Sequence, residues 1–212
     1  LYNDRCLADS ARLISENTQK ADDMSIVHRV PAIAHIIEQF RFPDKETVLT
    51  PWRVVNMHIG DCIGGQVFFD EDKTTELPKP RYVSHGEVTE NVFKDKNTRI
   101  LEINSKTGLY PLYMTYSVFA EKLKEYRDSH KLATDIPLDV QNQIWDEVLR
   151  NNIFVICKTP MAKSITNRTL RGFSSATVNT HYFDDLVNML INKPEQFRKR
   201  ILKGSYWKKD VS

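Results

Sequence analysis

The sequence has few glycines, few cysteines and no long apolar run. It holds only 7 glycines in 212 residues, so each glycine cluster is more informative than usual. Cys6, Cys62 and Cys157 are far apart and form no C-x-x-C pair, which indicates reduced, partly buried thiols in a cytoplasmic protein. No apolar segment approaches the ~18 residues of a membrane span and no signal peptide is present, so we expect no membrane association.

Other common site signatures are also missing. There is no Gly-x-Ser-x-Gly nucleophile motif, and Lys106-Thr107 lacks the upstream glycine of a phosphate-binding loop. A metal centre is not indicated either, because the histidines have no metal-ligand spacing. We interpret four histidines as structural or surface residues: His35, His58, His85 and His181.

What is present fits a soluble globular protein with one α/β domain and a short extra segment, because 41% of residues are hydrophobic and 27% charged. The net charge of +2 neither demands nor excludes nucleic acid. The chain begins at Leu1 rather than Met and stops in a basic run, so we expect a piece of a longer protein. In the segment Arg198–Lys209, basic residues alternate with Tyr206 and Trp207. That pattern suits nucleic-acid contacts as well as a solvated helix end.

The first part of the chain reads as helical, with Pro31 interrupting an amphipathic stretch over 26–40. Thr50 is predicted as the N-cap of the next helix, with Pro51 in its first turn. Residues 60–92 are expected to be irregular, as a loop or a small insertion, because a glycine pair, two prolines and an acidic run break any periodicity.

From residue 99 the pattern changes to strands that alternate with helices, which predicts a mainly parallel sheet. The continuous apolar run Asn152–Cys157 is typical of a strand inside such a sheet. Strands are predicted at 99–103, 152–157 and 176–182. Helices are predicted at 109–126, 138–150, 160–170, 183–191 and 194–202.

The strand, loop and helix over 99–119 have the geometry of a ligand site. Ligands in open parallel sheets bind beyond the carboxyl ends of strands, where Glu102 stands and the loop residue Asn104 follows. Gly108 would let the backbone approach a ligand, and the helix amides after it can receive a carboxylate or a polar edge. An ordinary strand-to-helix connection with a turn glycine explains the same residues, and both interpretations stay open.

The segment resembles amino-methyltransferases of restriction–modification systems. These carry an aspartate, a proline, two variable residues, Gly-x-Gly and then an aromatic residue that opens a helix. At those places stand Glu102, Ile103, Lys106, Gly108 and Tyr110, with glutamate for aspartate, isoleucine for proline and lysine for the first glycine.

Three further segments are similar to the same family in the same order. Residues 47–59 resemble the Thr-Pro-x-x-Val-Val-x-x-Met segment that folds over the methionine end of the cofactor. Residues 152–170 resemble the second strand and the helix that a proline opens after it. Where the family has an acid that binds the ribose hydroxyls, this chain has Cys157–Thr159. Of these, Thr159 can accept only one of the two hydroxyl protons. Residues 177–186 resemble the third strand, where Asp184, or alternatively Asp185, would receive the adenine amine.

The resemblance implies a Rossmann-like class I methyltransferase core with a helical lead-in over 1–46. A cofactor-binding domain over 47–212, with an insertion at 60–95, would continue beyond the chain. The implied cofactor is S-adenosylmethionine. Its implied binding residues are Thr50, Pro51, Glu102, Asn104, Lys106, Gly108, Tyr110, Thr159 and Asp184.

The implied activity is DNA adenine methylation. In this family, methylation of a base amine needs an [Asn/Asp/Ser]-Pro-Pro-aromatic loop, which follows the fourth strand. No Pro-Pro pair occurs in the 212-residue sequence. We therefore name no catalytic residue and expect the parent protein, in the cytoplasm, to bind double-stranded DNA and to work with a restriction subunit or domain. The alternative is a non-catalytic domain of the same fold that acts as a DNA- or protein-binding scaffold.

Overall fold

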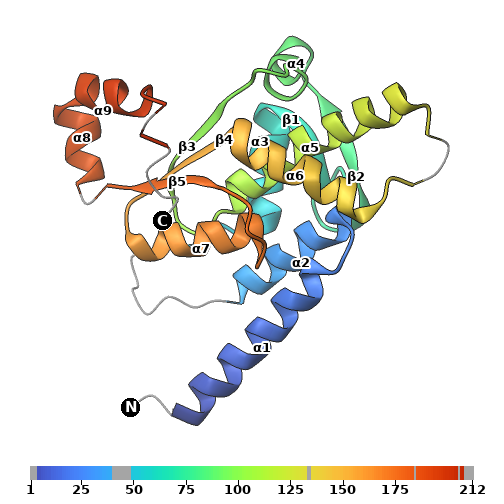
Figure 1. Ribbon diagram of the computed structural model, residues 1–212, viewed down its shortest axis with the longest axis horizontal. Coiled ribbons are helices and arrows are strands. Elements are labelled where there is room, and N and C mark those ends of the chain that lie inside the picture. The colour runs from blue at the N-terminus through green and yellow to red at the C-terminus, as the bar shows by residue number, and fades with distance from the viewer. Residues whose placement is uncertain (1–3, 40–48, 133–134, 184, 205, 208–212) are drawn as a thin grey trace.

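The computed structural model describes residues 4–39, 49–132, 135–183, 185–204 and 206–207. The predicted adenine-binding residue Asp184 therefore lies outside the described residues. The fold is mixed α/β, with a parallel three-stranded sheet, an antiparallel two-stranded sheet and helices packed around both (Figure 1). Within these ranges, no helix is long and apolar enough to cross a membrane.

The chain opens with two helices, α1 (Asp4–Asp22) and α2 (Ile26–Glu38), as the sequence predicts. The expected interruption at Pro31 is wrong, because α2 runs through this proline without a break. A proline inside a helix costs roughly 3 kcal/mol through its missing N–H and the clash of its ring. Burial of an apolar face offsets this cost, since five α2 side chains enter the core: Ile26, Val30, Ile33, Ala34 and Ile37.

The next helix, α3 (Trp52–Cys62), corrects a second expectation. Its N-cap residue is Pro51 rather than Thr50, and Pro51 has an extended backbone and no capping side chain. The carboxylate of Glu38, at the end of α2, instead accepts a hydrogen bond from the Trp52 backbone N–H. A negative charge at a helix N-terminus stabilises it, so the end of α2 caps the start of α3.

The region expected to be irregular is an ordered hairpin and a helix: β1 (Gly64–Phe69), β2 (Glu76–Ser84) and α4 (Glu87–Phe93). The strands pair in antiparallel fashion, and β1 buries its apolar residues. Glycine is required at Gly64, where φ is +86° and a Cβ atom would lie 2.4 Å from the Val83 carbonyl oxygen. The prolines Pro78 and Pro80 are tolerated because, among the described residues, β2 pairs with β1 alone and leaves its other edge unpaired.

The parallel sheet confirms the predicted α/β alternation. Its strands, in spatial order, are β3 (Ile100–Ser105), β4 (Ile153–Cys157) and β5 (Asn179–Tyr182). Helices α5 (Leu109–His130) and α6 (Leu138–Asn151) connect β3 to β4, and α7 (Pro160–Arg171) connects β4 to β5. The chain continues into α8 (Leu186–Asn192) and α9 (Pro194–Ile201).

One hydrophobic core joins the parallel sheet to the rest of the molecule. Its largest fully buried side chains come from α3, β1, α5 and α6: Trp52, Phe68, Tyr113, Phe119 and Trp145. Side chains of α2 belong to the same core. The N-terminal helices and the hairpin therefore pack as part of the structure that supports the parallel sheet.

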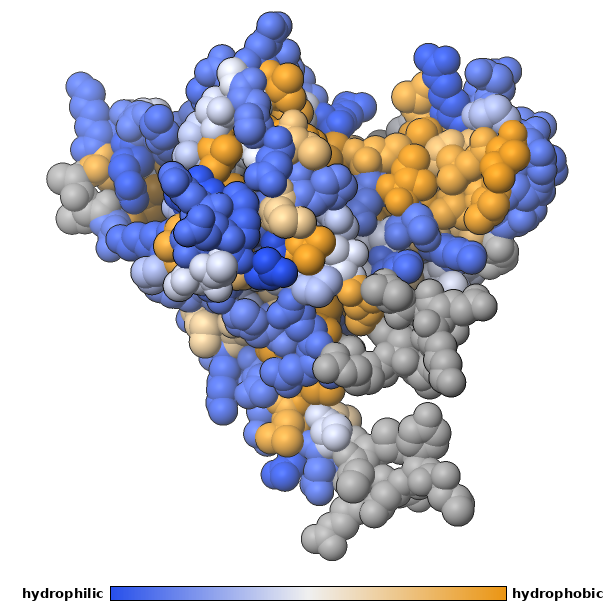
Figure 2. Space-filling view, turned by 180° about the vertical axis from the view of Figure 1, so that it is seen from behind, coloured by the Kyte–Doolittle hydropathy of each residue, from blue (hydrophilic) through white to orange (hydrophobic). Residues whose placement is uncertain are grey.

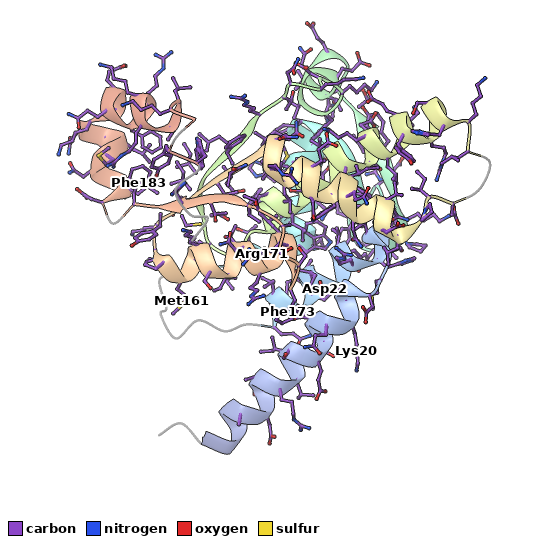
Figure 3. All side chains as sticks on the ribbon, viewed as in Figure 1. Lys20, Asp22, Met161, Arg171, Phe173 and Phe183 are labelled. Carbon is purple, nitrogen blue, oxygen red and sulfur yellow. The ribbon has the colours of Figure 1, made fainter. Side chains whose placement is uncertain are left out.

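The end of α1 is attached to the end of α7 through Asp22 (Figure 3). Its carboxylate accepts a hydrogen bond of 2.8 Å from the Phe173 backbone N–H. Only glycine fits at the neighbouring Gly172, where φ is +60° and a Cβ atom would lie 2.1 Å from the Asp22 carboxylate. This contact fixes α1 against the helix that borders the predicted cofactor site.

A smaller aromatic cluster joins α8 and α9 to the far side of the sheet. The Tyr206 ring lies 4.2 Å from the His181 ring, and the Trp207 ring lies 5.0 Å from that of Phe154 (centroid distances). The Trp207 indole N–H also donates to the Ile201 carbonyl. Tyr206 and Trp207 thus pack against the protein's own rings, which favours the helix-end interpretation of this basic segment over base stacking.

Candidate cofactor site

The site is built where β3 and β4 end side by side. Their parallel register pairs Glu102 with Val155 and Ser105 with Cys157, and it shifts by one residue between Ile103 and Ser105. The extra residue is Asn104, whose φ of +72° is the left-handed conformation that asparagine tolerates better than most residues. This bulge leaves Asn104 exposed at the strand end and buries Ser105.

The loop after β3 is attached to α7. The Thr169 hydroxyl donates to the Thr107 carbonyl at 2.6 Å, and the Ser105 and Thr166 hydroxyls lie 3.3 Å apart. Gly108 has φ of +83°, and a Cβ atom there would lie 3.1 Å from the Thr166 Cα. Glycine at 108 therefore allows the start of α5 to pack closely on α7. That it also lets the backbone approach a ligand stays a prediction.

Tyr110, in the first turn of α5, joins the two segments that resemble methyltransferase motifs. Its hydroxyl lies 3.0 Å from Nδ1 of His58, and the side chain of Thr50 lowers the pKa of this hydroxyl against the larger raising effect of burial. The Tyr110 and His58 rings meet edge to face, with centroids 5.8 Å apart and planes at 89°. The structure thus brings Thr50 and Tyr110 together and adds His58, which the sequence interpretation had set aside.

Glu102 is the carboxylate of this group, and the structure corrects its expected place. Because β3 runs on to Ser105, Glu102 lies within the strand, opposite Val155, and not at its carboxyl end. Burial raises its pKa to about 8, although a hydrogen bond from Ser105 opposes the shift. Its charge also reaches Tyr110 and Cys157. Burial is the main cause that raises the pKa of Tyr110, and it raises the pKa of the Cys157 thiol to about 11, with Glu102 adding to both shifts. Glu102 therefore changes charge near neutral pH, whereas Cys157 stays a thiol.

The end of β4 is less suited to ribose. Cys157 is buried, with its sulfur 3.8 Å from the Thr166 hydroxyl, and Lys158 and Thr159 are exposed. The Thr159 hydroxyl is the N-cap of α7 and accepts a hydrogen bond of 3.1 Å from the Ala162 backbone N–H. That bond occupies part of its capacity to accept protons from a ribose hydroxyl.

The remaining predicted residues are at the surface of the same region or beyond it. Pro51 and Lys106 are exposed, at the start of α3 and in the β3–α5 loop. Asp185, the alternative to Asp184, is exposed and accepts a hydrogen bond of 2.5 Å from the Asn188 amide. Asp185 thus lies exposed in the segment after β5, where the contact with the cofactor adenine was expected.

The arrangement offers hydrogen-bonding groups rather than an activated thiol. The Glu102 carboxyl within β3 has a raised pKa, hydroxyls stand near the end of this strand, and the nearby Cys157 thiol is held in its neutral form. No group of three or more His, Cys, Asp or Glu side chains that could hold a metal ion occurs in the described part of the chain.

Comparisons with known proteins add no relative. No family model matches the chain, and neither a curated protein nor a solved structure does so.

Proposed function

We propose that this site binds S-adenosylmethionine and that the chain is the cofactor-binding part of a DNA adenine methyltransferase of a restriction–modification system. The observation that carries the proposal is the 3.0 Å hydrogen bond between His58 and Tyr110. These residues come from the segments 47–59 and 99–119, which each resemble the family. They meet where Glu102 acts electrostatically on Tyr110, near the edge of the sheet where ligands of open parallel sheets bind.

The residues have complementary roles in this proposal. Thr50 and Pro51 would cover the methionine end of the cofactor, and the Glu102 carboxylate would face its positive charges. Lys106 would offer a cation to the cofactor carboxylate. Asp184, or Asp185 beside it, would accept the exocyclic amine of the cofactor adenine.

In the parent protein the chemistry would be a direct methyl transfer to the exocyclic amine of a flipped adenine. The bound cofactor supplies the methyl group, while the residues of this chain bind and orient it. The Pro-Pro-aromatic loop that holds the target base would come from another part of the parent, together with its contacts to double-stranded DNA and to a restriction subunit or domain.

We further propose that β3, β4 and β5 are three strands of a larger Rossmann-like core. The outer edge of β3 has no strand partner among the described residues, and the Leu101 and Ile103 side chains on this strand are 38% and 40% exposed. Other exposed apolar residues lie on α8, including Val187 and Ile191, and Figure 2 shows apolar surface gathered toward the α8 and α9 side. Apolar surface beside an open strand edge favours further packing partners.

A scaffold that has lost the cofactor is the second candidate. It is favoured by the end of β4, where no acid stands and the Thr159 hydroxyl already caps α7. A carboxylate accepts both ribose hydroxyl protons, and nothing else in that short segment does so.

Calorimetric titration of the chain with S-adenosylmethionine separates the two candidates. We expect one bound molecule per chain with micromolar affinity, and a clear loss of affinity in Tyr110→Ala. Tyr126→Ala, at the other end of α5, is the matched control and should bind as the unaltered chain does. Absence of binding by a folded sample would contradict the proposal and support the scaffold.

A further inference from the structure

We propose that His58 is a positioning residue of the cofactor site. It holds the Tyr110 ring through the bond between Nδ1 and the tyrosine hydroxyl, and thereby fixes α3 against the start of α5. The inference rests on the proposed function, because the Tyr110 ring is taken to border the methionine end of the cofactor.

The two side chains meet in a defined geometry. The 3.0 Å contact sets the position of the tyrosine hydroxyl, and the edge-to-face packing at 89° sets the plane of its ring. Each contact alone leaves one rotation of the ring free. Together they select a single orientation of Tyr110 relative to α3.

The Thr50 side chain also acts on the Tyr110 hydroxyl, whose pKa it lowers against the larger raising effect of burial. Thr50 stands just before α3, and His58 lies roughly two helical turns further along. If the tyrosine hydroxyl donates to Nδ1, His58 carries its proton on Nε2.

The fold does not depend on His58. This side chain is exposed, whereas α3 is anchored by the fully buried Trp52 and Val55. The buried Asn56 amide also accepts a hydrogen bond of 2.8 Å from the Phe68 backbone N–H and so joins α3 to β1. Loss of the imidazole should therefore free the Tyr110 ring without releasing α3.

The test is a set of variants titrated with S-adenosylmethionine. His58→Ala should weaken binding about three- to tenfold, the range expected for one hydrogen bond that orders a side chain. His58→Asn keeps a polar atom near the place of Nδ1 and should restore most of the affinity, whereas His58→Gln places it near Nε2 and should not. In the Tyr110→Phe background, His58→Ala should cause little further loss.

His130→Ala is the matched control, because His130 also contacts a tyrosine of α5, with its ring stacked 4.0 Å from that of Tyr126. It should leave affinity unchanged. Circular dichroism and thermal unfolding verify that each variant is folded, and His58→Asn and Tyr110→Phe keep the test informative if His58→Ala fails to fold.

The outcomes separate the inference from the function on which it rests. If the unaltered chain binds cofactor and His58→Asn is as weak as His58→Ala, or the His58 and Tyr110 losses add independently, the positioning role is wrong while the cofactor site stands. A lower melting temperature with unchanged affinity overturns it too. No binding by the unaltered chain overturns both proposals.

Discussion

Ionisation of Glu102 should make cofactor binding depend on pH. Burial raises the pKa of this carboxyl to about 8, so at neutral pH most free molecules carry it protonated. S-adenosylmethionine brings a sulfonium and an ammonium, and a cation next to Glu102 favours the ionised carboxylate. Binding should therefore release a proton from Glu102, and affinity should rise as pH increases toward the raised pKa.

The raised pKa of Glu102 sets the expected magnitude. Below a pKa of about 8, each pH unit changes the ionised fraction of Glu102 nearly tenfold. Affinity should thus rise about tenfold between about pH 6 and pH 7, which corresponds to ~1.4 kcal/mol. The neighbouring Tyr110 and Cys157 have raised pKa values, so neither ionises in this interval and neither contributes.

The assay is calorimetric titration at both pH values in buffers of different ionisation enthalpy, which counts the protons released. Glu102→Gln imitates the protonated carboxyl, so it should bind weakly at both pH values and lose most of the pH dependence. Glu147→Gln, which removes a carboxylate paired with Lys122 on α5, is the control. Equal affinity at the two pH values, or the same slope in Glu102→Gln, would refute the reasoning.

Four further predictions follow from the structure. Stability of the free protein should fall as pH rises from about 4.5 to about 8, because folded Glu102 keeps a proton that the unfolded chain releases, and Glu102→Gln should flatten this decline in urea unfolding. Gly108→Ala should lower the free energy of unfolding by about 2–4 kcal/mol, because it adds a Cβ atom at positive φ against α7. Gly204 has open space around it, so Gly204→Ala should leave the urea midpoint unchanged. Thr159→Ala should lower the free energy of unfolding by about 1 kcal/mol, because it removes the N-cap of α7. Thr159→Asn should restore this stability in the same urea unfolding assay. The chain alone should transfer no labelled methyl group to duplex DNA, and labelled product would contradict the need for a separate Pro-Pro-aromatic loop.

Elements with a strong local signal were predictable. The run Ile153–Cys157 is continuously apolar because both faces of a central parallel strand are covered, and the structure has β4 there. Thr159 and Pro160 similarly mark the start of α7, where hydroxyl and proline occupy their usual places. The segments 47–59 and 99–119 each resemble the family, and the structure joins them through the hydrogen bond between His58 and Tyr110, while cofactor binding stays a prediction.

Features that depend on distant partners were not predictable. Glycine and proline in residues 60–92 indicated an irregular segment, yet the glycines of β1 adopt positive φ against packed neighbours, and β2 has only one partner strand. The cap of α3 comes from Glu38, which local patterns around Thr50 cannot reveal. His58 is a single histidine whose partner lies far along the chain, so its role needed the fold.

The attachment of the β3–α5 loop to α7 has a kinetic consequence. The Thr107 carbonyl, the Ser105 hydroxyl and Gly108 all contact α7, so contacts within the protein itself hold the loop backbone. A ligand at the end of β3 would meet a preformed surface and lose little free energy to loop ordering. Association there should be a single step whose rate rises linearly with ligand concentration, without the plateau that a slow loop rearrangement imposes.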